Sequence, residues 1–285
     1  MRKLSESFLQ TLQIGFLSGL TQRVIEDIDL DLEIRSNSIN IYYKGNSLLK
    51  LDEIRPKRYR ISIHPKFTGG VDFQELVDEE TTHAFLQQIP LIKENIIKHG
   101  KSSLEIEYEQ MIIRANNYEP RNNSEYFIVD RQYVAGQSRR FDLTGFNWPR
   151  DGRKWKQEVS VCLFEVKFAL NQDIQDGHQQ LMRYYDVIKD RAADIAYETE
   201  VVFKQKLELG FFNQSPARLE AMKTLSFARE IDKFQFVLVL VDYNPNSKLF
   251  SPDKLAQLPF AGQVRVFQGG FAMWSINMRP VVGDK

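Results

Sequence analysis

The sequence has very little of the chemistry that disulfides and zinc sites require. Its 285 residues include one cysteine, Cys162, and four histidines. One cysteine cannot form an internal disulfide, and the histidines, at positions 64, 83, 99 and 178, do not have zinc-ligand spacing. This usage suits a reducing compartment, so we expect a cytoplasmic protein without structural zinc.

Long apolar runs are also lacking. A membrane helix needs roughly 20 apolar residues, whereas the longest stretches here are short, such as FVLVLV at 236–241. Near the N-terminus, Glu6, Gln10 and Gln13 interrupt the apolar spacing, so we predict no signal peptide. These absences favour a soluble protein with no membrane partner.

The chain carries no net charge, because 38 Lys and Arg balance 38 Asp and Glu. Any surface for nucleic acid must therefore come from local patches. A G-x-S-x-G nucleophile motif is missing. Gly100-Lys101-Ser102 resembles the end of a phosphate-binding loop, but Asn95 stands where that motif has its first glycine. The sequence thus argues against nucleotide hydrolysis.

The composition is that of a globular protein, with 42% hydrophobic and 27% charged residues. Apolar side chains have helical spacing over 4–27, and alternation over 30–54 and 58–67 predicts a small antiparallel meander. Gly69-Gly70 then breaks the chain. We therefore predict an N-terminal subdomain, a helix plus a β-rich meander, over residues 1–80.

Residues 81–285 follow a different order, which predicts an α/β domain with a mixed sheet. The expected elements are helices at 82–99 and 103–117, strands at 125–135, 139–148 and 159–170, helices at 173–195, 196–209 and 216–230, a buried strand at 234–243, and two short strands around Gly269-Gly270. From residue 103 the order is helix, three strands, helices, strand.

The third strand, VSVCLFEVKFAL at 159–170, carries unusual charges. Both of its faces are apolar for most of its length, yet alternation places Glu165 and Lys167 on the same face as Val161 and Leu163. A charge in such a position is costly unless it is paired or holds a metal. One reading is therefore a Glu–Lys pair emerging into solvent at the strand end, and the other is a metal site.

Asp142 in the preceding strand favours the metal site. Paired strands lie about 4.8 Å apart, so the carboxylates of Asp142 and Glu165 could reach one Mg²⁺ ion. Magnesium prefers a few carboxylate oxygens and keeps several waters. In the following helix, Gln180 and Tyr184 are four residues apart and share one face.

Phe141-Asp142, Glu165-Val166-Lys167 and Gln180 to Tyr184, in this order, resemble the PD-(D/E)xK nuclease superfamily. The Q-x-x-x-Y spacing is similar to that of its RecB-like branch, and the resemblance covers about 103–245. Phe141 replaces the proline of the motif. The resemblance implies a restriction-endonuclease-like αβββαβ core, with an N-terminal β-rich subdomain added in this chain.

The resemblance also implies roles for individual residues. Asp142 and Glu165 would hold Mg²⁺ or Mn²⁺ with the Val166 carbonyl, and Lys167 would assist the attacking water. Gln180 and Tyr184 would support the site. The family often adds a glutamate from the helix before the first strand. Glu105, Glu107 and Glu109 compete for that place, and we favour Glu109, which flanks the apolar stripe of that helix.

Basic residues stand close in sequence to these motifs. We expect nucleic-acid contacts from Arg139, Arg140, Arg153, Lys154 and Lys156, with base stacking on Trp148 or Trp155. The loop at 149–156 joins the two ligand-bearing strands, so we expect it at one end of the site. An ordinary solvated loop is the alternative. A second basic run covers 55–60.

The sequence therefore predicts a metal-dependent nuclease that acts on DNA rather than RNA, in defence or repair. One alternative is a catalytically silent nuclease-fold protein that binds nucleic acid or a protein partner. Another is an α/β protein in which Glu165 and Lys167 form a structural ion pair. The N-terminal subdomain could select substrates, bind a partner or form a homodimer.

Overall fold

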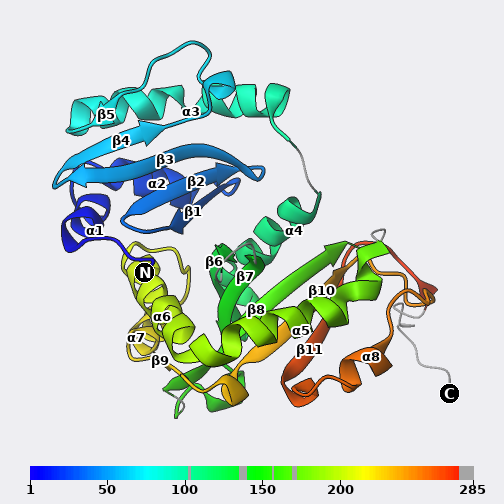
Figure 1. Ribbon diagram of the computed structural model, residues 1–285. Helices are drawn as coiled ribbons and strands as arrows, with labels where there is room; N and C mark the ends of the chain where they lie inside the picture. The colour runs from blue at the N-terminus through cyan, green and yellow to red at the C-terminus, as the bar shows by residue number, and fades with distance from the viewer. Residues whose placement is uncertain (102–103, 135–139, 156, 169–171, 276–285) are drawn as a thin grey trace.

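The chain forms two β-sheets with helices packed around them, a mixed α/β architecture (Figure 1). The computed structural model describes residues 1–101, 104–134, 140–155, 157–168 and 172–275. The expected α/β class is confirmed. Within these described ranges no helix combines the length and the apolar character needed to cross a membrane.

The N-terminal sheet is an antiparallel meander in the order β1-β2-β3-β4-β5. Its strands are β1 (Leu30–Ile34), β2 (Ser38–Tyr43), β3 (Asn46–Arg55), β4 (Arg58–Ser62) and β5 (Glu75–Leu76). Lys44 and Gly45, between β2 and β3, both have positive φ angles, as tight hairpin turns require. The alternation at 30–54 and 58–67 therefore predicts β1 to β4 correctly, whereas β5 lies outside the predicted strands.

Three helices cover this sheet, α1 (Glu6–Gln13), α2 (Ser18–Glu26) and α3 (Glu79–His99). The helix expected over 4–27 is divided into α1 and α2, with Ser5 capping α1. Asp78 caps α3 with a capping box. Phe85, Ile89 and Ile92 of α3 belong to the core under the N-terminal sheet, so this helix packs with the meander that precedes it.

The second sheet has the order β11-β10-β8-β7-β6, with β9 paired to the start of β8. The strands are β6 (Tyr126–Val134), β7 (Arg140–Asn147), β8 (Glu158–Phe168), β9 (Ser226–Phe227), β10 (Gln235–Val241) and β11 (Val264–Gly269). Strands β6, β7 and β8 are antiparallel neighbours, and β10 runs parallel to β8. The expected order of helix, three strands, helices and strand is confirmed.

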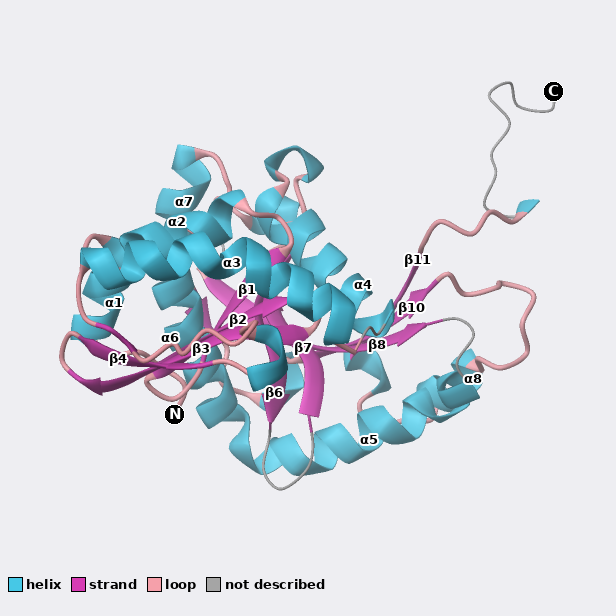
Figure 2. Cartoon of the chain, turned by 90° about the horizontal axis from the view of Figure 1, so that it is seen from above, coloured by secondary structure: helices cyan, strands magenta, loops and turns pink. Residues whose placement is uncertain are grey.

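Helices cover both faces of this sheet, and Figure 2 shows α4 and α5 on opposite sides of β8. They are α4 (Leu104–Ile113), α5 (Gly177–Ile188), α6 (Ala192–Glu208), α7 (Pro216–Lys223) and α8 (Pro252–Ala256). Cys162 and Val166 lie in the core beside α4, whereas Val161 and Leu163 lie in the core beside α5 and α6. Strand β8 is thus buried on both faces, as its apolar pattern predicts.

Two expectations near the C-terminus are wrong within the described residues. The helix expected over 216–230 ends at Lys223, because the chain turns to form β9 beside β8. Only one strand, β11, stands at the Gly269-Gly270 turn where a pair was expected. It extends the sheet parallel to β10 instead of forming a hairpin.

Candidate functional site

The predicted carboxylates meet where β7 and β8 separate. The two strands pair as far as Leu143 opposite Phe164, and one further step of this register places Asp142 opposite Glu165. There the main-chain N–H of Val166 donates to Oδ2 of Asp142 at 2.8 Å. The Asp142 carboxylate thus accepts a main-chain N–H at the point where the ladder between the two strands ends. This contact fixes Asp142 against the strand that carries Glu165.

Glu165 and Lys167 form a close ion pair in the interior. Lys167 Nζ lies 2.6 Å from Glu165 Oε1, and the two residues are only 6% and 1% exposed. They occupy alternate positions on β8, so they project from the same face. The pair is therefore buried and does not emerge into solvent.

Helix α5 adds the third predicted motif. The Tyr184 hydroxyl lies 2.6 Å from Glu165 Oε2 and 2.9 Å from the Arg140 carbonyl, so one proton serves two acceptors. Gln180 Nε2 donates to the Tyr184 oxygen at 3.3 Å, and the Phe141 ring packs against Tyr184 with centroids 4.3 Å apart. The Q-x-x-x-Y face of the helix thus orients the glutamate.

The two neighbouring carboxylates oppose one another electrostatically. Burial, then the charge of Glu165, raises the pKa of Asp142 well above its usual value, although the Val166 N–H bond opposes the shift. Burial tends to lower the pKa of Lys167, but Glu165 and Asp142 outweigh it and the pKa is raised. Burial and Glu165 also raise the pKa of Tyr184. The cluster therefore has an excess of negative charge.

The donor set fits a hard divalent cation. Asp142 and Glu165 offer carboxylate oxygens at one place, and Mg²⁺ is commonly bound by one or two carboxylates and several waters. A cation there would remove the repulsion that raises the pKa of Asp142. Among the described residues, no group of three or more His, Cys, Asp or Glu side chains is placed to hold a metal ion. A cation bound by the two carboxylates would therefore take water for its remaining ligands.

The glutamates of α4 lie near this cluster in different ways. Glu109, the expected third acid, is 2% exposed and its Oε2 lies 3.1 Å from Nε of Arg131. The charges of both Glu109 and Glu105 raise the pKa of Asp142, and Glu105 also acts on Lys167. The structure thus brings Glu105 as well as Glu109 into the field of the site.

Arg131 is not among the site residues predicted from the sequence. It is fully buried between the N-terminal sheet and α4. The sequence carries one sign of this buried arginine, because the charged residues Asp130 and Arg131 directly follow the apolar run 126–129 within one predicted strand. A charge pair in such a strand needs partners, but its partners lie far away in sequence.

We expect a pH-dependent effect from Glu109→Gln. Burial, opposed by the charge of Arg131, raises the pKa of Glu109 to about 7. A raised pKa stabilises the fold below the unfolded value, and this stability is lost as the pH rises through about 7. The variant stays neutral, so its advantage in unfolding free energy over wild type should grow to about 3 kcal/mol by pH 8. Urea titrations at several pH values measure it, with Glu107→Gln as control. A difference independent of pH would contradict the burial argument.

The basic loop lies away from the site. Arg153 and Lys154 follow the end of β7, whereas Asp142 is near its start. Glu165 is seven residues after Glu158, the first residue of β8, which corresponds to about 23 Å along the strand. The expectation that this loop borders the site is wrong. The loop is the turn that joins β7 to β8, whereas Asp142 and Glu165 lie at the other end of that strand pair. Arg153 instead donates to the Trp148 and Ser124 carbonyls.

The remaining predicted contacts divide into three groups. Arg140 is exposed, and its carbonyl accepts from Tyr184, so it borders the site. Arg139 and Lys156 lie outside the described residues. Trp148 is 1% exposed and cannot stack on a base, whereas Trp155 is 85% exposed but lies in the distant loop.

The site thus rests on residues from two adjacent strands and one helix, held by contacts that are local to their meeting point. Asp142, Glu165, Lys167, Gln180 and Tyr184 come together there. No protein family model, curated protein or solved structure matches the chain.

Proposed function

We propose that this protein is a divalent-metal-dependent nuclease of the PD-(D/E)xK type. The observation that carries the proposal is the pair of adjacent carboxylates, Asp142 and Glu165, with Lys167 bonded to one of them. The αβββαβ order of α4, β6, β7, β8, α5 and β10 is similar to a restriction-endonuclease-like core. Order and site therefore support the same family.

A purely structural ion pair accounts less well for this cluster. The charges of Glu165 and Lys167 alone would cancel each other. Asp142 adds a second carboxylate and leaves the three groups with one excess negative charge, which is costly where burial is high. An arrangement that costs stability in this way is typical of a functional site.

The residues would divide the work of phosphodiester hydrolysis. Bound Mg²⁺ or Mn²⁺ would supply an activated water and neutralise phosphate charge. Asp142 and Glu165, with the Val166 carbonyl, would hold the cation. The Lys167 ammonium would stabilise the negative charge that develops on the phosphate. Tyr184 and Gln180 would keep Glu165 in its orientation.

The substrate we propose is DNA rather than RNA, in defence or repair. Arg140 is exposed beside the carboxylates and is suited to contact a phosphate. The charge balance of the whole chain is zero, so binding would depend on such local groups and would weaken with salt.

Tyr184→Phe should lower the cleavage rate about tenfold, since it removes the hydroxyl that holds Glu165. The ring keeps its packing on Phe141, so the melting temperature should change little. Steady-state cleavage rates measure the effect. Tyr185→Phe on the same helix is the matched control, because its ring packs on Phe260 away from the carboxylates. Equal rates for wild type and Tyr184→Phe would argue against the orienting role.

A substrate panel tests the proposal. Linear, circular and single-stranded DNA, and RNA, are incubated with the protein in Mg²⁺ or Mn²⁺, beside an EDTA control. We expect cleavage of DNA that requires the metal. Binding to DNA without cleavage of any substrate would favour the silent, nucleic-acid-binding alternative.

A further inference from the structure

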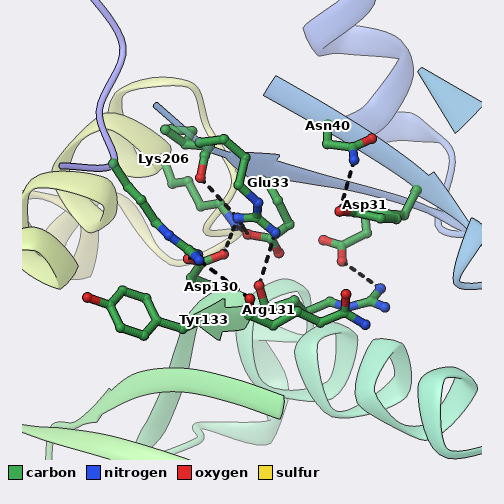
Figure 3. Close-up of polar contacts among 12 residues, drawn as sticks. Asp31, Glu33, Asn40, Asp130, Arg131, Tyr133 and Lys206 are labelled. Carbon is green, nitrogen blue, oxygen red and sulfur yellow. Dashed lines mark hydrogen bonds and ion pairs between the residues drawn. The ribbon is translucent and has the colours of Figure 1, made fainter. Parts of the chain in front are cut away.

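The two sheets meet through charged side chains at their edges. Strand β1 is the edge of the N-terminal sheet, β6 is the edge of the second sheet, and the two lie in contact without a shared ladder. Asp31 and Glu33 occupy alternate positions on β1, and their side chains point toward Arg131 of β6 and Lys206 of α6 (Figure 3). Arg35 follows directly after the strand. Arg35 pairs with Asp130 of β6 at 2.6 Å, and Glu33 pairs with Lys206 of α6 at 2.9 Å.

Arg131 of β6 joins this interface to helix α4. Its Nη1 lies 3.1 Å from Oδ2 of Asp31, and its Nε lies 3.1 Å from Oε2 of Glu109. The side chain of Arg131 is 1% exposed. One buried guanidinium therefore links the N-terminal sheet to the glutamate expected in the active site.

The backbone of β6 is distorted on both sides of Arg131. The register with β7 shifts between Ile128 and Asp130, and Gln132 has a φ of 53°. Bulges re-aim side chains and are frequent beside active sites, and a positive φ is costly for a residue other than glycine. These irregularities accompany the orientation of Arg131 toward Asp31 and Glu109.

The ion pair of Glu109 and Arg131 leaves buried hydrogen-bonding atoms without a partner. Glu109 Oε2 and Arg131 Nε are close, but they lack hydrogen-bond geometry, and neither atom has another hydrogen-bond partner in the described part of the chain. Buried polar atoms normally have partners. Arg131 pairs with Leu143 in the ladder, and the next residue along β7 is Asp142. Glu109 is close enough for its charge to raise the pKa of Asp142.

We propose that Asp31 and Arg131 are positioning residues that hold Glu109 toward the metal site, so that the N-terminal sheet completes the active site. This inference rests on the proposed nuclease function. Asp31 fixes Arg131 from one side, and Arg131 fixes Glu109 from the other. With a cation bound at Asp142 and Glu165, Glu109 would add negative charge beside it and could accept a hydrogen bond from one of its waters. Outer partners of this kind typically alter metal affinity about 10- to 100-fold when they are replaced.

The interface offers a matched control. Glu33 lies on the same strand as Asp31 and is also buried, but its ion-pair partners are Lys206 and Arg35. Glu33→Gln should therefore disturb the contact between the sheets without touching the proposed chain of positioning contacts. A role in stability alone would make the two substitutions equivalent.

Calorimetric titration with Mn²⁺ tests the inference on the full chain. Arg131→Lys should bind Mn²⁺ about tenfold more weakly than wild type, while Glu33→Gln binds within twofold. Melting temperatures verify that each variant folds. Should Arg131→Lys not fold, Asp31→Asn provides the same test, because it loosens Arg131 and keeps the shape of the side chain.

Each outcome separates the two proposals. Unchanged Mn²⁺ affinity in the folded positioning variant, or an equal loss in Glu33→Gln, overturns the role of Arg131. Wild-type protein that binds Mn²⁺ but cuts no nucleic acid overturns the nuclease and leaves this comparison valid. Wild-type protein that binds no Mn²⁺ overturns both.

Discussion

Asp142→Asn should abolish cleavage and make the metal-free protein more stable. The asparagine oxygen can still accept the Val166 N–H, and the Glu165–Lys167 pair is untouched. The excess negative charge disappears, and with it the repulsion that raises the pKa of Asp142. Because burial and the charge of Glu165 both disfavour the ionised Asp142, the unfolding free energy of the neutral variant should be higher than that of wild type. Cleavage should fall about 100-fold or more, as when one electrostatic stabiliser is removed.

Two measurements test the predicted loss of cleavage and the predicted gain in stability. Calorimetry in EDTA gives the melting temperature of the metal-free protein, and a cleavage assay in Mg²⁺ gives the rate. Added Mg²⁺ should stabilise wild type but not the variant, because only a binding-competent folded state gains from the ion. Asn147→Asp, at the other end of β7, tests whether any Asp/Asn exchange on this strand has the same effect. A variant that melts lower than wild type, or one that cuts at the wild-type rate, would contradict this prediction.

Lys206→Ala should be the most destabilising single change at the contact between the sheets. Its ammonium lies 2.9 Å from Glu33, a residue with no exposed surface. Without Lys206, the nearest cation to Glu33 in the described part of the chain is Arg35, at 3.8 Å. Loss of one partner from a buried pair typically costs about 3–5 kcal/mol, and we expect about 3 kcal/mol here because Arg35 compensates in part.

Urea unfolding measures this change, and a double variant provides the control. Glu33→Gln combined with Lys206→Met removes both charges, so most of the lost stability should return. Lys204 pairs with Glu200 nearer the surface, and Glu200 also binds Arg229. Lys204→Ala should therefore lower the unfolding free energy by less than about 1 kcal/mol. If Lys206→Ala were equally mild, the buried pair would not hold the two sheets together.

Local periodicity accounts for the parts of the fold that were predicted. Strand β8 was found because its apolar residues extend over both faces, and alternation alone places Glu165 and Lys167 on one side. Asp142 and Glu165 come together because β7 and β8 form one antiparallel hairpin. Tyr184 reaches Glu165 because the next helix folds back over the same face.

The position of the basic loop could have been derived by counting. The paired positions 143 and 164 are centred near residue 153, so the hairpin turn falls there and the carboxylates fall at the far end. Proximity of Arg153 to Asp142 in sequence was therefore misleading. Strand pairing reverses the chain, and the distance from the turn decides which residues share an end of the sheet.

Other features depend on long-range contacts that no local pattern reports. Arg131 is paired with Asp31, which is 100 residues earlier in the chain, and Lys206 is paired with Glu33 across 173 residues. The division of the first helix, in contrast, is local. It occurs at Gly15, where an added Cβ would lie 2.8 Å from the backbone of Thr11, so a residue without a side chain permits the close turn between α1 and α2.

Cleavage of one labelled linear DNA by wild type and Lys167→Ala, each in Mg²⁺ and in EDTA, tests the central claim most directly. Wild type should cut only with the metal, and the folded variant, which lacks the ammonium beside Glu165, should not cut under either condition. Full activity of Lys167→Ala in Mg²⁺, or cleavage by wild type in EDTA, would contradict it.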